Sequence, residues 1–290
     1  MFDQLTVSLR TLVDILALSG LGLVALILDT FTGIQPLQRG FYCDDYSIAK
    51  PYQPSTVSSR LLYTVIFLSV SATLSSTELL RLLLADKRKL KADLTNRVSN
   101  GNGFSVRQMV TNIYRQTGFF LFGLFVSLCL TLAVKLSVGR LRPNFLSVCQ
   151  PNRVLDTVCK RNPHAYVYPI PCESNNTRMI MESRVSFPSG HSSIAFYVAV
   201  WLVFYLHSRV DWKPSSRGRF MVVCIQFFWL LLAVITALSR ISDNKHHVSD
   251  VLAGSTLGIV MACVVAKLAG RSRLVDSIYT ERSAFPEFVV

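Results

Sequence analysis

Three short polar clusters interrupt an otherwise apolar chain, and each contains residue types that can handle phosphate. They are Lys135 with Arg142-Pro143, then Ser189-Gly190-His191, and finally Arg240 with His246 and Asp250. His246 and Asp250 lie four residues apart, so a helix starting there would present both on one face. A carboxylate in that position can hold the imidazole in one tautomer and stabilise its cationic form. Taken alone, this third cluster is typical of a polar turn between membrane helices.

Together, the clusters predict a site for a phosphate monoester. Lys135, Arg142 and Arg240 supply positive charge and forked donors that match phosphate oxygens. The segment from Pro188 to His191 would open a helix whose first N–H groups favour an anion, and Ser189 would donate to a phosphate oxygen. The sequence shows neither carboxylates arranged for magnesium nor a cysteine and histidine set for zinc. Positive side chains would therefore do the work that metal ions do elsewhere, and no cofactor is expected.

Two histidines would divide the chemistry. Hydrolysis of a phosphate monoester needs a nucleophile at phosphorus and an acid for the leaving oxygen. His246, oriented by Asp250, is predicted to be the nucleophile, and His191 would protonate the departing oxygen. Water would then hydrolyse the resulting phosphohistidine, with His191 acting as the base.

Six apolar runs must position these clusters. Of the 290 residues, 51% are hydrophobic and 16% are charged, whereas about a quarter of a soluble domain is charged. The runs are close to the ~20 apolar residues that cross a bilayer, and they cover about 11–29, 61–83, 117–136, 192–208, 220–238 and 248–268. The chain is therefore predicted to be an all-α membrane protein with six transmembrane helices, forming one integral domain over residues 1–290. The first run has no cleavage pattern and is expected to remain a helix.

The formal charge of +13 indicates membrane topology rather than nucleic-acid binding, because the basic residues gather between apolar runs. Segments 86–116 and 209–219 and the tail after Lys267 are basic, so both termini are predicted to be cytosolic. Loops 30–60, 137–191 and 239–247 would then be extracellular or lumenal. Loop 137–191 is itself basic, but long loops translocate with little regard to charge.

The outer loops contain four cysteines and a glycosylation sequon. Cys43, Cys149, Cys159 and Cys172 fall outside, where they allow three pairings between which the sequence does not choose. The sequon Asn175-Asn176-Thr177 lies in the same loop, with Asn175 as its acceptor. The same topology brings all three polar clusters to the outer side. Runs three and five end there and runs four and six begin there, so one outer pocket is expected.

The three clusters also carry a family resemblance. Lys-x6-Arg-Pro, Pro-Ser-Gly-His and Ser-Arg-x5-His-x3-Asp resemble the three signature motifs of the type 2 phosphatidate phosphatase superfamily. The six runs, the sequon and Arg39-Gly-Phe-Tyr-Cys43 resemble its lipid phosphate phosphatase (phospholipid phosphatase) branch. The resemblance covers most of the chain.

The resemblance implies a magnesium-independent ecto-phosphatase for phosphatidate, lysophosphatidate, ceramide 1-phosphate and sphingosine 1-phosphate, with a helical core shared with vanadium haloperoxidases. It implies that Lys135, Arg142, Ser189, Gly190 and Arg240 bind phosphate. His191 would be the acid, His246 the nucleophile and Asp250 its partner. Plasma membrane and endomembrane both remain open, with the plasma membrane favoured. The preferred lipid is open as well, and so is a homo-oligomer.

Three other functions fit the sequence less well. A catalytically silent relative, acting as a lipid-binding or scaffold protein, would lack motif residues, whereas here they are all present. An ion-coupled transporter would place its charges near the membrane midplane, and these lie at outer helix ends. A branch acting on soluble sugar phosphates would have more membrane runs.

Residues outside the motifs give smaller predictions. Glu78 and Arg81, three apart, would pair at the cytosolic border. Gly254 and Gly258 form a small-xxx-small pair suited to packing within the bundle, with a dimer face as the weaker option. Arg140 would either attract substrate or face water, and His247 is treated as a neighbour of the site.

Overall fold

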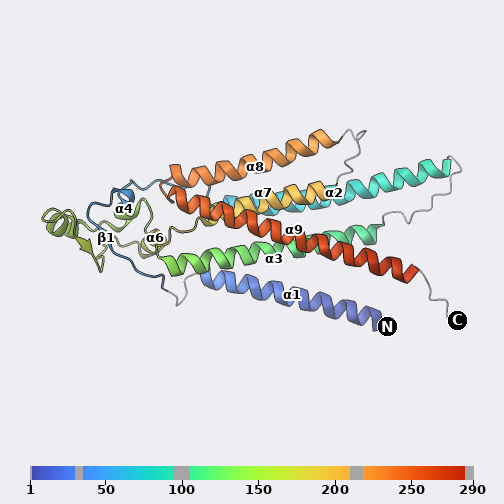
Figure 1. Cartoon of the computed structure of the whole chain (residues 1–290), viewed down its shortest axis with the longest axis horizontal. Coiled ribbons are helices and arrows are strands. Elements are labelled where there is room, and N and C mark those ends of the chain that lie inside the picture. Colours follow the sequence, from blue (N-terminus) through green and yellow to red (C-terminus); the bar gives the residue numbers. More distant parts are fainter. Residues whose placement is uncertain (1, 30–34, 95–104, 210–217, 285–290) are drawn as a thin grey trace.

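Six long helices run side by side in the computed structural model, which describes residues 2–29, 35–94, 105–209 and 218–284 (Figure 1). They are α1 (Phe2–Asp29), α2 (Ser59–Leu94), α3 (Val106–Val138), α7 (Gly190–Arg209), α8 (Arg219–Ser242) and α9 (Val248–Ala284). Within the described residues, each has a stretch long and apolar enough to cross a membrane. The predicted all-α class with six membrane helices is thereby confirmed, and the protein is a multi-pass membrane protein.

The observed helices are longer than the apolar runs from which they were predicted. Both α2 and α9 continue past their apolar parts into charged sequence. The segment Asn100-Gly-Asn-Gly, whose composition predicts a turn, lies outside the described residues. The start of α3 is fixed by a capping box between Ser105 and Gln108. Its end after Val138 is fixed by Gly139, which has a positive φ of 59° and donates its N–H to the carbonyl of Lys135.

Helix α7 is the centre of the bundle. In its apolar stretch 61% of residues are buried, against 6% in α1. It packs most closely on α9, where Gly254 and Gly258 lie directly against the backbone carbonyls of Ser189 and Ser193. A side chain at either glycine would collide with that backbone, so the pair packs within the bundle as predicted. Along α7, the aromatic side chains of Trp201 and Tyr205 stack inside the core.

A small cap covers the end of the bundle opposite the two chain termini (Figure 1). Its strands β1 (Phe41–Tyr42) and β2 (Tyr166–Val167) are antiparallel, with Phe41 opposite Val167. Short helical segments complete it, namely η1 (Tyr46–Ile48), α4 (Phe145–Cys149), α5 (Asn152–Val154), the π-helical turn η2 (Leu155–Cys159) and α6 (Thr177–Ser183). The cap has its own apolar core, centred on Phe145 and Ile48.

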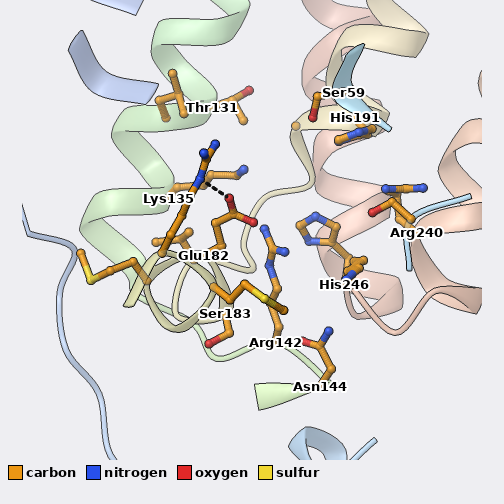
Figure 2. Close-up of a pocket in the computed structure, with 18 of the residues that line it drawn as sticks. Ser59, Thr131, Lys135, Arg142, Asn144, Glu182, Ser183, His191, Arg240 and His246 are labelled. Carbon is orange, nitrogen blue, oxygen red and sulfur yellow. Dashed lines mark ion pairs between the residues drawn. The ribbon is translucent and has the colours of Figure 1, made fainter. Parts of the chain in front are cut away.

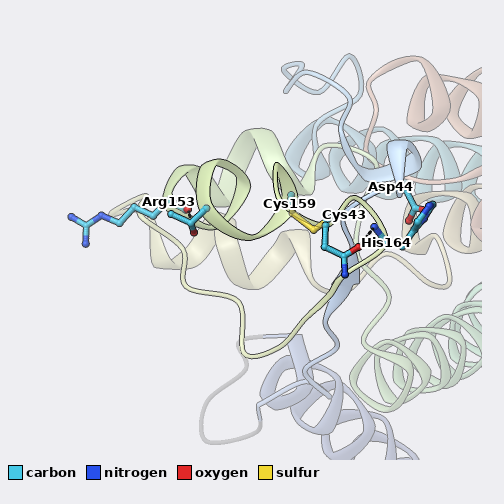
Figure 3. The surroundings of a disulfide bond; sticks show 7 residues. Cys43, Asp44, Arg153, Cys159 and His164 are labelled. Atoms are coloured by element: carbon cyan, nitrogen blue, oxygen red, sulfur yellow. Dashed lines mark hydrogen bonds and ion pairs between the residues drawn. A yellow bond between two sulfur atoms is a disulfide. The ribbon is translucent and has the colours of Figure 1, made fainter.

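Two disulfides tie the cap together and settle the pairing that the sequence left open. Cys43 pairs with Cys159 and Cys149 pairs with Cys172. Beside the first disulfide, the exposed His164 pairs with Asp44 at 2.7 Å (Figure 3). His164 is thus a surface residue of the cap.

At the other end of the bundle, Glu78 is completely buried. The predicted pair with Arg81 is present, at 2.9 Å between Nη1 and Oε2. Glu78 also lies 3.1 Å from Arg209 Nε and accepts a hydrogen bond from the Tyr205 hydroxyl at 3.2 Å. Because α2 and α7 share this carboxylate, the network joins them at the end that carries the termini.

Candidate active site

The three polar clusters meet in one cavity of about 790 Å³ between the cap and the ends of the helices that the cap covers. Figure 2 shows Arg142, His191, Arg240 and His246 around a common space. Six of the residues predicted for the site line this cavity, namely Lys135, Arg142, Gly190, His191, Arg240 and His246. Ser189 and Asp250 lie behind it and are fully buried.

Backbone hydrogen bonds connect the three clusters to one another. The N–H of Arg142 donates to the carbonyl of Ser183, and the N–H of Ser186 donates to the carbonyl of Arg140, both at 2.8 Å. These bonds join the end of the first motif to the segment that enters α7. The N–H of Ser189 donates to the carbonyl of Asp250 at 2.9 Å, which joins the second motif to the third.

His246 is held by the backbone of a residue that the sequence analysis did not single out. Its Nδ1 lies 2.7 Å from the carbonyl oxygen of Ser186. A carbonyl oxygen only accepts, so Nδ1 carries the proton and Nε2 keeps its lone pair. Burial is the main reason that the pKa of His246 falls to about 3, and Arg142 and Lys135 lower it further. The imidazole is therefore neutral at physiological pH, as a nucleophile requires.

Asp250 reaches His246 differently from the prediction. Helix α9 begins at Val248, so His246 lies in the preceding turn, and the predicted shared helix face is wrong. The nearest oxygen of Asp250 is 3.8 Å from Nδ1, longer than a hydrogen bond. Ser186 connects the two residues, because its carbonyl accepts from His246 and its hydroxyl donates to Asp250 at 2.6 Å.

Asp250 is also bound by Arg140. For this arginine the sequence predicted either a role in attracting substrate or a position facing water. Arg140 Nη1 lies 2.6 Å from Asp250 Oδ1, and it donates to the Ser249 hydroxyl at 2.7 Å. The N–H of His247 donates to the other carboxylate oxygen at 2.9 Å. The side chain of His247 points elsewhere, with Nε2 at 3.1 Å from the carbonyl of Leu141. Asp250 thus has a full set of donors before any contact with His246.

Two nitrogens in the cavity wall are buried without a partner. Within the described part of the chain, neither Arg142 Nε nor His191 Nε2 has a hydrogen-bond partner. Buried polar groups are almost always hydrogen-bonded, so such orphans call for a ligand. Burial also lowers the pKa of Arg142, which an anion bound in the cavity would reverse.

Arg240 and Lys135 complete the cationic wall. Arg240 is fixed from behind, because its Nη2 lies 2.7 Å from Asp243 Oδ2 and its Nε donates to the Ser239 hydroxyl at 3.1 Å. Lys135 lies opposite, close to the start of α7, since a Cβ on Gly190 would be 3.5 Å from its Nζ. A methyl group at position 190 would therefore be in ordinary van der Waals contact with the lysine.

The cavity has further polar residues that the sequence analysis did not predict. Lys245 lines it with its Nζ 3.8 Å above the ring of Tyr52. Burial, followed by the charge of Arg142, lowers the pKa of Lys245 to about 8. Glu182 of α6 also lines the cavity and lies 3.5 Å from Arg178 Nε. Lys245 directly precedes His246, so its position beside the third cluster was the available signal, whereas nothing in the sequence marked Tyr52 or Glu182.

Apolar side chains from membrane helices line the same cavity. They include Leu62 of α2, Leu128 and Leu132 of α3, and Ile194 of α7. The cavity therefore has a cationic part beneath the cap and an apolar part that begins within the membrane helices. An amphiphile with an anionic head fits this division.

Ser189 caps the start of α7. Its Oγ accepts from the hydroxyl of Ser192 at 2.9 Å, and it is not among the residues that line the cavity. Its contact with phosphate stays a prediction. Among the residues whose side chains are described, no three His, Cys, Asp or Glu side chains come together as a metal site would need.

Comparison with known proteins agrees with this geometry. A family profile described as the PAP2 superfamily matches residues 116–274, more than half of the chain. A putative phosphatidate phosphatase of Drosophila melanogaster is 38% identical over 80% of this chain, which spans 61% of that protein's length. Phospholipid phosphatase 2 of Rattus norvegicus is 37% identical, with 79% of this chain and 75% of that protein aligned. The human phospholipid phosphatase 2 is 36% identical, with 79% and 72% aligned.

The chain therefore belongs to the PAP2 superfamily. No solved structure matches the chain significantly, so a core shared with vanadium haloperoxidases stays a prediction.

Proposed function

We propose that this protein is a metal-independent phosphatase that removes phosphate from lipid phosphate monoesters at the outer side of a membrane. Its family and the phosphatase names of its relatives support an enzyme of the phosphatidate phosphatase type. The observation that carries the proposal is the pair of unpartnered buried nitrogens, Arg142 Nε and His191 Nε2, in a cavity also lined by Lys135 and Arg240. A phosphate group supplies the acceptors that these donors lack.

The apolar lining supports a lipid substrate. Leu62, Leu128 and Leu132 belong to membrane helices and line the cavity that the cations line. A phosphate headgroup could enter while its hydrocarbon remained at membrane depth. The proposed substrates are phosphatidate, lysophosphatidate, ceramide 1-phosphate and sphingosine 1-phosphate.

In the proposed mechanism, the lone pair on His246 Nε2 attacks phosphorus and the bond from phosphorus to the ester oxygen breaks. His191 gives its proton to that oxygen, so the lipid leaves as an alcohol. The proton on Nδ1 remains against the Ser186 carbonyl, and nearby Asp250 stabilises the positive phosphoimidazole. Water then attacks phosphorus, His191 takes its proton, and phosphate leaves neutral His246 behind.

The same proposal places the cap outside the cytosol. Two disulfides within the cap fit an oxidising compartment. The predicted acceptor Asn175 is exposed beside α6, where a glycosyltransferase could reach it. The termini lie at the opposite end of the bundle and would be cytosolic, and the plasma membrane is the favoured location (Figure 1).

The test is phosphate release from phosphatidate by detergent-purified protein in the presence of a chelator. Wild-type protein is expected to release phosphate, and His246→Ala is expected to lose at least about 1,000-fold in kcat, as loss of a nucleophile does. His164→Ala is the matched control, because that histidine is exposed in the cap. Absence of release by the wild type would favour the silent, lipid-binding alternative. Release that survives His246→Ala would refute the mechanism.

A further inference from the structure

A second apolar hollow lies beside the phosphate cavity, in the groove between α2 and α8. It has a volume of about 190 Å³, and Ala195 and Ala199 of α7 line it together with Ala233 of α8. These alanines let α7 and α8 pack closely, while α2 packs on α7 and makes little contact with α8. The groove therefore forms because α2 and α8 make little contact with each other, and the surface between them has three small alanine side chains.

The groove adjoins the phosphate cavity. Leu62 of α2 lines both spaces, so the two are neighbours at this side chain. The outer end of the groove is at Thr236, one helical turn before Arg240. On the α2 side it begins at Val57, next to Thr56, whose N–H and hydroxyl bind Asp243 at 2.8 and 2.7 Å. Asp243 in turn holds Arg240, so the groove starts beside the support of a phosphate-binding residue.

We propose that this groove holds one hydrocarbon chain of the substrate whose phosphate lies in the cavity. The second chain of a two-chain lipid would lie on the other side of α2, against Leu128 and Leu132. Helix α2 would thus pass between the two chains, with Leu62 at the point where they diverge. This inference rests on the proposed function and adds to it a basis for choosing among lipid substrates.

An unbranched hydrocarbon chain fits the groove better than a protein segment does. A membrane helix is about 10–12 Å across with its side chains, too wide for a hollow of about 190 Å³ floored by alanines. The rim residues Leu61 and Val65 are exposed to the lipid side, so a chain can enter sideways from the bilayer. The groove is lined almost entirely by apolar side chains, so it offers nothing to a polar ligand.

The groove is expected to raise the reaction rate by orienting the bound lipid. Lipid tails are as apolar as leucine, so moving a chain from bilayer to groove yields little hydrophobic free energy. Fixing the chain beside Arg240 instead holds the headgroup in the geometry of attack, which raises the rate of reaction. A single-chain lipid can place its only chain on the α3 side, so its turnover should not need the groove.

The experiment fills the groove with Ala199→Phe and compares three substrates in mixed micelles, namely dioleoyl phosphatidate, oleoyl lysophosphatidate and dihexanoyl phosphatidate. Ala72→Phe is the control, because Ala72 is exposed on α2 outside the groove. We expect kcat/KM of Ala199→Phe to fall about tenfold for dioleoyl phosphatidate and by less than about twofold for the other two. Equal losses on all three substrates, or no loss on dioleoyl phosphatidate, would overturn the inference.

A second arm does not depend on turnover. Phosphatidate with a diazirine on one chain is photolysed with His246→Ala protein, and the labelled peptides are mapped. Labelling of α8 around Trp229 and Ala233, displaced by unlabelled phosphatidate but not by phosphatidylcholine, supports the inference. Equal displacement by both lipids would show an ordinary bilayer lipid in the groove and would refute it. Failure of wild-type turnover, in contrast, would count against the proposed function alone.

Discussion

Arg140 offers the sharpest test of how the site is built, because it binds Asp250 without lining the cavity. We predict that Arg140→Gln lowers kcat and leaves KM nearly unchanged. Asp250 would keep the Ser186 hydroxyl at 2.6 Å and the His247 N–H at 2.9 Å, so it would remain in place with less restraint. We expect a fall in kcat of about tenfold, equivalent to about 1.4 kcal/mol of activation free energy.

The substitution also has an electrostatic signature. The Asp250 carboxylate separates the two side chains, with contacts of 2.6 Å to Arg140 and 3.8 Å to His246. At a separation of about 8 Å and an effective dielectric constant near 20, the guanidinium disfavours imidazolium by roughly 2 kcal/mol. The Arg140 side chain is 37% exposed, so solvent screening weakens this repulsion. The corresponding change in the pKa of His246 is about one pH unit.

The direction of the shift follows from the charges. The pKa of His246 is already lowered to about 3, and removal of a nearby positive charge must raise it. The acid limb of kcat/KM in Arg140→Gln should therefore move upward by about one pH unit. Arg140→Lys keeps the charge and should keep the wild-type limb.

The assay is the pH dependence of phosphate release, with Arg153→Gln as the control. Arg153 is exposed on the cap, and its side chain points away from the helix bundle (Figure 3). The pH profile of this control variant includes the ionisation of the substrate itself. A rise in KM that accounts for the whole loss would show that Arg140 contacts substrate directly. An unchanged kcat with an unchanged acid limb would refute the positioning role.

Two further predictions concern charge and stability. Because the pKa of Lys245 is lowered to about 8, its charge is lost as pH rises through that value, so kcat/KM should fall on the alkaline side. Lys245→Arg should remove this limb, whereas Lys160→Arg on the cap surface should leave it in place. Glu78→Ala removes a completely buried carboxylate that pairs with Arg81 and Arg209, so it should lower the free energy of unfolding by about 3 kcal/mol, measured as a drop in thermal midpoint. Asp86→Ala, an exposed carboxylate on the same helix, should change the midpoint little, and equal drops would contradict the role of burial.

The order of residues along the chain was enough to predict the membrane helices and the gathering of the polar clusters. Apolar runs of bilayer length specify helices regardless of their neighbours, because backbone groups in lipid must bond within their own segment. The alternation of those runs then forces Lys135, His191 and His246 to the same end. The packing role of Gly254 and Gly258 was readable for a similar reason, since a glycine pair at helical spacing permits close approach wherever the partner lies.

Tertiary structure decided which groups touch. The bond from His246 Nδ1 goes to the Ser186 carbonyl, because a residue sixty positions earlier in the chain is held there by the hydrogen bond from its N–H to the Arg140 carbonyl. No spacing rule anticipates that contact, or the ion pair of Arg140 with Asp250. The disulfide pairing and the groove over Ala199 likewise depend on distances between segments remote in sequence. Residue order therefore predicts which kinds of residue form the site and that they share one side of the membrane, whereas the packing of the helices and the cap sets how each of them is held.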